Sequence, residues 1–183
     1  LQDSSAASDV YKRQYKHPVT SVGWPSYYTE DYASNAAAFH NMVSSFICEG
    51  VFAKFSDLKI VLAESGFTWF PAHLWRLTKF WRGLRAEIPW VDRPPIEIAR
   101  DHFRLTLQPI DAPPTTEQFE RLMDHMGSDE MLLYSTDYPH WQFDETNVIP
   151  DGITKDLAIK IMEQNPKNTY PRLSAPLNNG IDQ

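Results

Sequence analysis

The sequence has a single cysteine, Cys48, among 183 residues. One cysteine cannot form a disulfide within the chain, so nothing here implies an oxidising compartment. Basic residues are also scarce, since 17 Lys and Arg stand against 24 Asp and Glu, for a formal net charge of -7. The sequence contains no basic stripe, which argues against nucleic acid as a partner.

Long apolar runs are absent as well. No segment approaches the roughly 20 consecutive apolar residues that a membrane-spanning helix needs. No charged, apolar and small-residue succession typical of a signal peptide is present either. These absences predict a protein with no membrane partner, and they make the cytoplasm the default location.

What is present centres on the segment MLLYSTDYPHW at residues 131–141. Its first residues are mostly apolar and lie between turn-forming residues and a proline, which predicts a short strand buried on both faces. Such strands belong to parallel sheets covered by helices, where function sits at the carboxyl ends of the strands. Asp137 and His140 follow this strand and are candidates to hold a metal or move a proton. The alternative is that Asp137 only caps the next segment.

Two further segments, 58–63 and 103–107, are predicted to be strands. Glu64 follows the first of them, where we expect its carboxylate to be partly shielded from water and suited to acid–base work. Apolar residues at helical spacing predict helices between the strands. Their expected buried faces include Phe39, Val43 and Ile47 in the first helix, and Leu74, Leu77, Trp81 and Leu84 in the second.

Strands that alternate with helices predict parallel βαβ units and an α/β fold. The pattern supplies about three to four such units, whereas a complete TIM-type (β/α)8 barrel takes about 250 residues. We therefore predict a partial barrel over residues 15–173. Residues 1–14 have no apolar period and are predicted to be a non-native or disordered leader, and residues 174–183 a disordered tail.

The segment 135–141, STDYPHW, followed by Phe143 and Asp144, resembles the last barrel strand of the amidohydrolase-related family, which includes proteins similar to aminocarboxymuconate-semialdehyde decarboxylase. Other segments of the chain resemble the same family in the same order, from about residue 15 to residue 173. They are GWPSYY at 23–28, GVF at 50–52, LKIVLAESG at 58–66, WRL at 75–77, TLQP at 106–109 and NPKNTY at 165–170. The resemblance implies that the chain is the carboxyl-terminal part of such a barrel.

The resemblance also implies a metal-dependent activity. Asp137 would be a ligand of a divalent metal, zinc foremost, with manganese, iron or magnesium as alternatives. His140 would orient the substrate or the Asp137 loop. Glu64 would stand across the barrel mouth, where many members of the wider family have a histidine. The other ligands expected from the family, a His-x-His pair and a fifth-strand histidine, are absent from this chain.

For the intact parent, the resemblance implies hydrolysis or non-oxidative decarboxylation of a small organic molecule through a metal-activated water, and a possible homodimer. The fragment alone is predicted to be inactive. Two alternatives stay open. In the first, Glu64 and Asp137 form a metal-free carboxylate pair for glycoside hydrolysis. In the second, the chain is a truncated barrel without catalysis.

Overall fold

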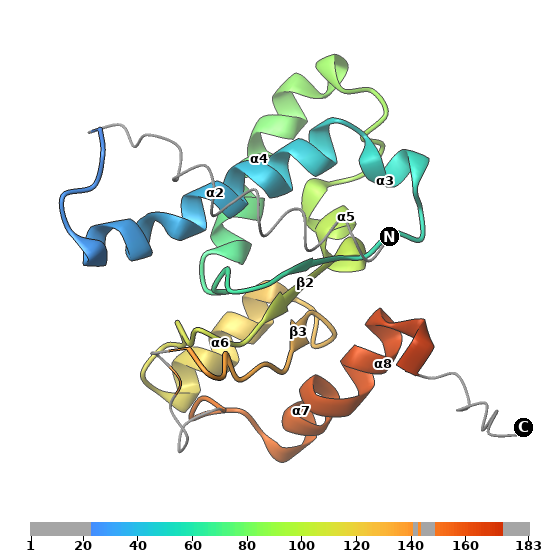
Figure 1. The fold of residues 1–183 in the computed structure, drawn as a ribbon. Helices are drawn as coiled ribbons and strands as arrows, with labels where there is room; N and C mark the ends of the chain where they lie inside the picture. Colours follow the sequence, from blue (N-terminus) through green and yellow to red (C-terminus); the bar gives the residue numbers. More distant parts are fainter. Residues whose placement is uncertain (1–22, 141–142, 144–148, 174–183) are drawn as a thin grey trace, which may run out of the picture.

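The computed structural model describes residues 23–140, 143 and 149–173 (Figure 1). The predicted leader and tail lie outside these residues. Along the described part of the chain, the elements are α2 (Tyr28–Cys48), α3 (Val51–Lys54), β1 (Ile60–Leu62), α4 (Phe70–Leu84), η1 (Arg85–Glu87), α5 (Pro95–His102), β2 (Phe103–Thr106), α6 (Thr116–Met126), β3 (Leu132–Leu133), α7 (Lys155–Ile159), the π-helical turn η2 (Lys160–Gln164), α8 (Asn165–Thr169) and η3 (Pro171–Leu173). None of the described helices is both long enough and apolar enough to span a membrane.

The strands form a parallel sheet in the order β1-β2-β3 within the described residues. Leu62 pairs with Leu105 of β2, and Leu105 pairs in turn with Leu132 of β3. Each strand is joined to the next by a helical crossover, as parallel pairing requires. Figure 1 shows α2, α4 and α5 gathered above the strands and α7 and α8 below them. The predicted βαβ succession is therefore confirmed, although the strands are shorter than the apolar runs that predicted them.

Phe103, the first residue of β2, joins the sheet to the helices. Its side chain is 0% exposed. Its ring meets three other rings edge-on, those of Phe46 on α2, Phe52 on α3 and Phe70 on α4, with centroid distances of 6.3, 5.3 and 6.2 Å. Leu105, two residues on, lies on the same face of the strand and is also 0% exposed. These contacts place the main hydrophobic core between β2 and the first helices.

Arg104 lies on the opposite face of β2 and is nevertheless buried. Its Nη1 donates to the backbone oxygens of Arg100, Asp101 and Phe103 at 3.1, 3.4 and 2.8 Å. The oxygens of Arg100 and Asp101 belong to the last turn of α5, where helix carbonyls have no partner within the helix, and that of Phe103 belongs to the residue that follows the helix. Burial lowers the pKa of the Arg104 guanidinium. The side chain therefore caps α5 and fixes the helix against the strand that follows it.

The helix boundaries follow the capping residues. The Thr115 hydroxyl accepts from the backbone nitrogen of Gln118 at 3.3 Å, and Gly127 ends α6 in the left-handed conformation with φ 64. Thr154 caps α7 in the same way. The expectation that Leu84 is buried is wrong, because Leu84 is the last residue of α4 and is 52% exposed. The apolar period of α4 extends to Leu84, whereas Trp81 is the last residue of this period that packs against the core.

Two imidazoles meet between α2 and α4. The rings of His40 and His73 stack with centroids 4.6 Å apart, and His40 also lies 4.4 Å from the ring of Trp69. The hydroxyl of Ser44 lies 3.0 Å from His73 Nε2. Burial, and then the neighbouring His40, lower the pKa of His73 from 6.5 to about 4. Burial also lowers the pKa of His40, so both rings are neutral in the folded protein near neutral pH.

This pair predicts a loss of stability in mild acid. The unfolded chain takes up a proton at His73 near pH 6.5, whereas the folded chain does so only near pH 4. The stabilisation is therefore complete above pH 6.5 and is lost as the pH falls from 6.5 towards 4. We expect the urea midpoint of His73→Gln to depend less on pH across this window. His125→Gln, a change on the exposed side of α6, is the control and should keep the original slope. An unchanged slope in His73→Gln would contradict the assignment.

Candidate active site

The carboxyl ends of the three described strands are linked by side-chain hydrogen bonds. The backbone nitrogen of Glu64 donates to the Thr106 hydroxyl at 3.0 Å, and that hydroxyl donates to the backbone oxygen of Gln108 at 3.2 Å. The backbone nitrogen of Gln108 donates to the Ser135 hydroxyl at 3.0 Å. These bonds continue the ties between neighbouring strands beyond the last residue of each strand. They hold the segments that carry Glu64 and Asp137 in fixed positions at one edge of the sheet.

Asp137 and His140 are brought together by a tight turn after β3. The backbone nitrogen of His140 donates to the Asp137 carbonyl at 2.7 Å, and His140 Nδ1 lies 3.2 Å from Asp137 Oδ2. The Asp137 side chain is 10% exposed and that of His140 is 35% exposed. These two atoms lie within ion-pair distance, but the contact between them does not have the geometry of a hydrogen bond. The structure therefore pairs the two residues that the sequence placed after this strand.

Asp137 and Glu64 share an unusual backbone conformation. Their φ angles are 57 and 56, the positive values found for non-glycine residues in the described part of the chain. This left-handed region is sparsely occupied by residues with a side chain, although aspartate tolerates it better than most. Residues held in such conformations cluster at active sites. The backbone turns at both residues, so both carboxylates are carried on turns that follow strands.

Glu64 differs from its expected environment. It follows β1, which lies on the other side of β2 from Asp137, and its side chain is exposed rather than partly shielded. The expectation of partial burial is wrong for the described structure, because neither the loop after β1 nor the loop after β2 covers the side chain. Neighbouring strands lie about 4.8 Å apart, so the backbones of β1 and β3 are roughly 10 Å apart. The structure does not bring Glu64 to the Asp137–His140 pair.

Asp111, in the loop after β2, was not singled out from the sequence. Its carboxylate accepts from the backbone nitrogens of Phe67 and Thr68 at 3.1 and 3.2 Å, and from the Thr68 hydroxyl at 2.7 Å. A Cβ on Gly66, which has φ 66, would lie 2.6 Å from Asp111 Oδ2. A glycine is therefore needed there for the carboxylate to approach. Asp111 anchors the loop that follows Glu64 to the loop of the next strand.

Another family segment, NPKNTY at 165–170, has a clear structural role. Asn165 is buried, and its Nδ2 donates to the backbone oxygens of Asp129 and Leu132 at 2.8 and 3.0 Å. One side chain thus ties the start of α8 to β3 and to the turn before it. Asn165 therefore helps to hold the strand that leads to Asp137.

The described residues supply only part of a metal site. Within residues 23–140, 143 and 149–173, no group of three or more His, Cys, Asp and Glu side chains could hold a metal ion. At this edge of the sheet the carboxylate of Asp137 is shielded, and it already faces His140. Carboxylate oxygen is a common ligand for zinc, magnesium and manganese. Asp137 fits the part of a single ligand, and a complete site needs donors from elsewhere.

The described chain is an α/β protein whose polar candidate residues lie at the carboxyl ends of parallel strands. Residues 23–172 match the family model described as amidohydrolase. The chain therefore belongs to the amidohydrolase family, which confirms the resemblance found in the sequence. No curated protein matches the chain.

The chain is also similar to a crystal structure of an amidohydrolase from Mycobacterium avium subsp. paratuberculosis K-10. The TM-score is 0.56 at 22% sequence identity, and the match covers 77% of this chain and 35% of the other. The chain thus spans about a third of the length of that protein. With the parallel sheet, this likeness confirms part of a TIM-type barrel as the fold. The roles of Asp137, His140 and Glu64 stay predictions.

Proposed function

We propose that this chain supplies the last strands of the active site of a metal-dependent hydrolase or carboxy-lyase that acts on a small organic molecule. The observation that supports this most directly is the Asp137–His140 pair. A carboxylate that is 10% exposed, with a left-handed backbone, follows the last described strand of a barrel from the amidohydrolase family. Active sites of TIM-type barrels lie at this end of the strands.

Asp137 would be the ligand that this chain gives to a divalent metal, zinc foremost. A bound divalent metal lowers the pKa of water and so supplies a nucleophile near neutral pH. Asp137 would also accept a proton in the reaction, because its carboxylate is shielded from bulk water by its surroundings. The remaining ligands would come from barrel strands that this sequence does not contain.

His140 would act as a positioning residue for this carboxylate. Its Nδ1 faces Asp137 Oδ2 at 3.2 Å, and its backbone nitrogen holds the Asp137 carbonyl. Together these contacts fix both ends of the Asp137 residue. Glu64, exposed at the end of β1, would contact the substrate at the mouth of the barrel rather than the reacting atoms. The link from Glu64 to Thr106 holds its backbone in place for that contact.

Metal removal tests the proposal. In the full-length protein that contains this chain, we expect chelation to abolish turnover and zinc or manganese to restore it, because the metal would supply the activated water. Turnover would be followed on aryl esters, anilides and aromatic carboxylic acids, with metal content measured by mass spectrometry. Release of carbon dioxide identifies decarboxylation, and release of alcohol or amine identifies hydrolysis. Undiminished turnover by the metal-free protein would reject the proposal in favour of the Glu64 and Asp137 carboxylate pair.

A further inference from the structure

The outer edge of β3 is bonded to the helices that follow it. Among the strands of the described chain, β3 is the last of the sheet and pairs with β2. The backbone oxygens of Met131 and Leu133 accept from nitrogens of the segment 105–107, at 2.9 and 3.0 Å. The direction of hydrogen bonding alternates along a strand, so the backbone groups of Leu132 and Tyr134 point away from β2.

Two of these outward-pointing groups have partners that are not strands. The backbone oxygen of Leu132 accepts from Asn165 Nδ2 at 3.0 Å. The backbone nitrogen of Tyr134 donates to the backbone oxygen of Ile161 at 3.2 Å. In a parallel pair, a single residue of the neighbouring strand would supply both this donor and this acceptor. Asn165 and Ile161 together therefore take the place of one residue of a further strand.

The π-helical turn η2 makes the Ile161 oxygen available for this bond. In an α-helix, the backbone nitrogen of Asn165 would donate to Ile161, four residues earlier. It donates to the oxygen of Lys160 instead. The residue five places after Ile161 is Pro166, which has no N–H to donate. Neither of these helix positions uses the Ile161 oxygen, so this oxygen is left to accept from Tyr134.

Burial and further contacts hold this arrangement in place. Ile161 and Asn165 are 1% and 2% exposed. Asn165 Nδ2 also donates to the backbone oxygen of Asp129 at 2.8 Å, and Lys160 forms an ion pair with the Asp129 carboxylate. Loss of the Asn165 amide would leave buried carbonyl oxygens without this donor, which costs more than the bond itself contributes. The segment from Asp129 to Tyr134 is therefore fixed to η2 and the start of α8.

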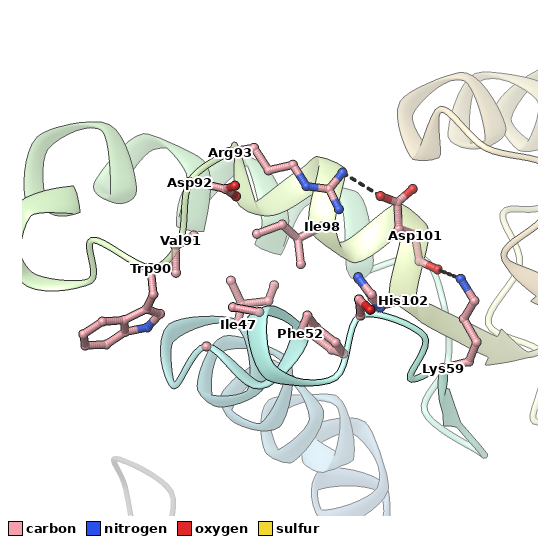
Figure 2. Close-up of a pocket in the computed structure, with 13 residues that line it drawn as sticks. Ile47, Phe52, Lys59, Trp90, Val91, Asp92, Arg93, Ile98, Asp101 and His102 are labelled. Atoms are coloured by element: carbon pink, nitrogen blue, oxygen red, sulfur yellow. Dashed lines mark hydrogen bonds and ion pairs between the residues drawn. The ribbon is translucent and has the colours of Figure 1, made fainter.

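A side chain also ties β1 to a helix, but at the other end of the sheet. Lys59 directly precedes β1, and its Nζ donates to the backbone oxygen of Asp101 at the end of α5, at 2.5 Å (Figure 2). The two residues line a pocket of about 420 Å³, in which Asp101 also pairs with Arg93 at 2.6 Å. This pocket lies at the amino ends of the strands, whereas Asp137 follows a carboxyl end. Of the two ties, that of Tyr134 lies next to the candidate site.

We propose that Asn165, Pro166 and Ile161 form an edge cap that positions Asp137. Tyr134 lies three residues before Asp137, so a shift of the Ile161 oxygen would move Tyr134 and the turn that carries the Asp137 carboxylate. The three residues of the cap act through Tyr134 and are positioning residues. The effect on Asp137 rests on the proposed function, whereas the edge cap itself does not.

Amide hydrogen exchange in the 183-residue chain, followed by two-dimensional NMR, tests the edge cap. We expect the Tyr134 amide to exchange at least about tenfold more slowly than an unstructured amide, because its bond to Ile161 must open first. Pro166→Ala supplies an N–H that competes for the Ile161 oxygen, and should speed this exchange at least about fivefold. Asn165→Asp keeps the shape of the side chain but replaces the donor with an acceptor, and should also speed it.

Pro171→Ala is the matched control, because it is the same substitution in η3, outside the π-helical turn. It should leave exchange at Tyr134 as in the parent. The same spectra report whether each variant is folded. Rapid exchange at Tyr134 in the parent, or unchanged exchange in a folded Pro166→Ala, would overturn the edge cap.

Two further measurements test the effect on Asp137. In the 183-residue chain, Pro166→Ala should shift the amide resonances of Asp137 and His140, and Pro171→Ala should not. In the full-length protein, Pro166→Ala should lower kcat at least about tenfold and change KM less than about twofold, because a small misplacement of a reacting group mainly affects the chemical step.

The outcomes separate this proposal from the proposed function. Faster exchange at Tyr134 with unchanged kcat would mean that a strand of the full-length barrel holds Tyr134 instead, and would overturn the positioning of Asp137. Unmoved resonances of Asp137 and His140 in Pro166→Ala would overturn it as well. Turnover that survives metal removal would reject the proposed function, and the exchange and resonance measurements would still decide the edge cap and its effect on Asp137.

Discussion

Asp137→Asn is expected to lower the turnover of a full-length enzyme containing this chain by roughly two to four powers of ten. The substitution keeps the size and the hydrogen-bonding reach of the side chain but removes its charge and its capacity to accept a proton. Asparagine tolerates the left-handed region about as well as aspartate, so the φ of 57 at this position adds no backbone penalty. Any loss of turnover would therefore report on charge and proton transfer.

Turnover and bound metal would be measured side by side, at equal folded fraction, for the parent and for Asp137→Asn. Asp124→Asn, on the exposed side of α6, removes one carboxylate from the surface and is the matched control. If Asp137 only caps the loop, its replacement should be almost silent, because asparagine caps about as well as aspartate. Near-parent turnover with the metal retained would exclude Asp137 from the mechanism and leave Glu64 as the next candidate.

The fold was predictable from the sequence to the level of elements and their order. The segments at residues 58–63 and 131–134 are mostly continuous apolar runs, which is typical of strands covered on both sides, whereas residues 103–107 alternate weakly between apolar and polar. Met131 and Leu132 are 0% exposed, as this pattern requires. The caps at Thr115 and Thr154 are local in sequence and were equally visible. The lengths of the strands and the end of the buried part of α4 were not predictable from the sequence, because they depend on which residues pack against each position.

The candidate site was predictable only in part. Asp137 and His140 are three residues apart after one strand, so their contact needed a single turn. The burial of Glu64 depends on loops that come from elsewhere in the chain, and no local pattern predicted that it would be exposed. Asp111 was missed for the same reason, since its partners Phe67 and Thr68 lie more than 40 residues earlier. A lone aspartate in a proline-containing loop has no periodicity to indicate a partner.

The close approach of Trp90 to Gly50 left still less trace in the sequence. In the sequence, Gly50 lies between two apolar segments, and Trp90 lies in a segment that has prolines at positions 89, 94 and 95. Their contact joins residues 40 apart, and a Cβ at Gly50 would lie 2.5 Å from the indole ring. The need for glycine there comes from both a φ of 68 and the ring that lies over it. Only the three-dimensional arrangement relates the two residues.

Phe103→Ala is expected to be the most destabilising single substitution considered, with a loss of about 3–5 kcal/mol in the free energy of unfolding. Phe103 is 0% exposed and meets three rings from three different helical elements, so its removal leaves a cavity at their common junction. The three partners are fixed by their own packing and cannot close the gap, which adds a cavity term to the lost transfer free energy. Urea unfolding followed by circular dichroism would measure the change. Phe55→Ala, at a phenylalanine that is 61% exposed, is the control and should shift stability by about 0.5 kcal/mol or less. A loss below about 1 kcal/mol for Phe103→Ala would mean that β2 does not pack on α2, α3 and α4 in solution. Truncation of a fully buried phenylalanine among three rings should destabilise the fold by more than that.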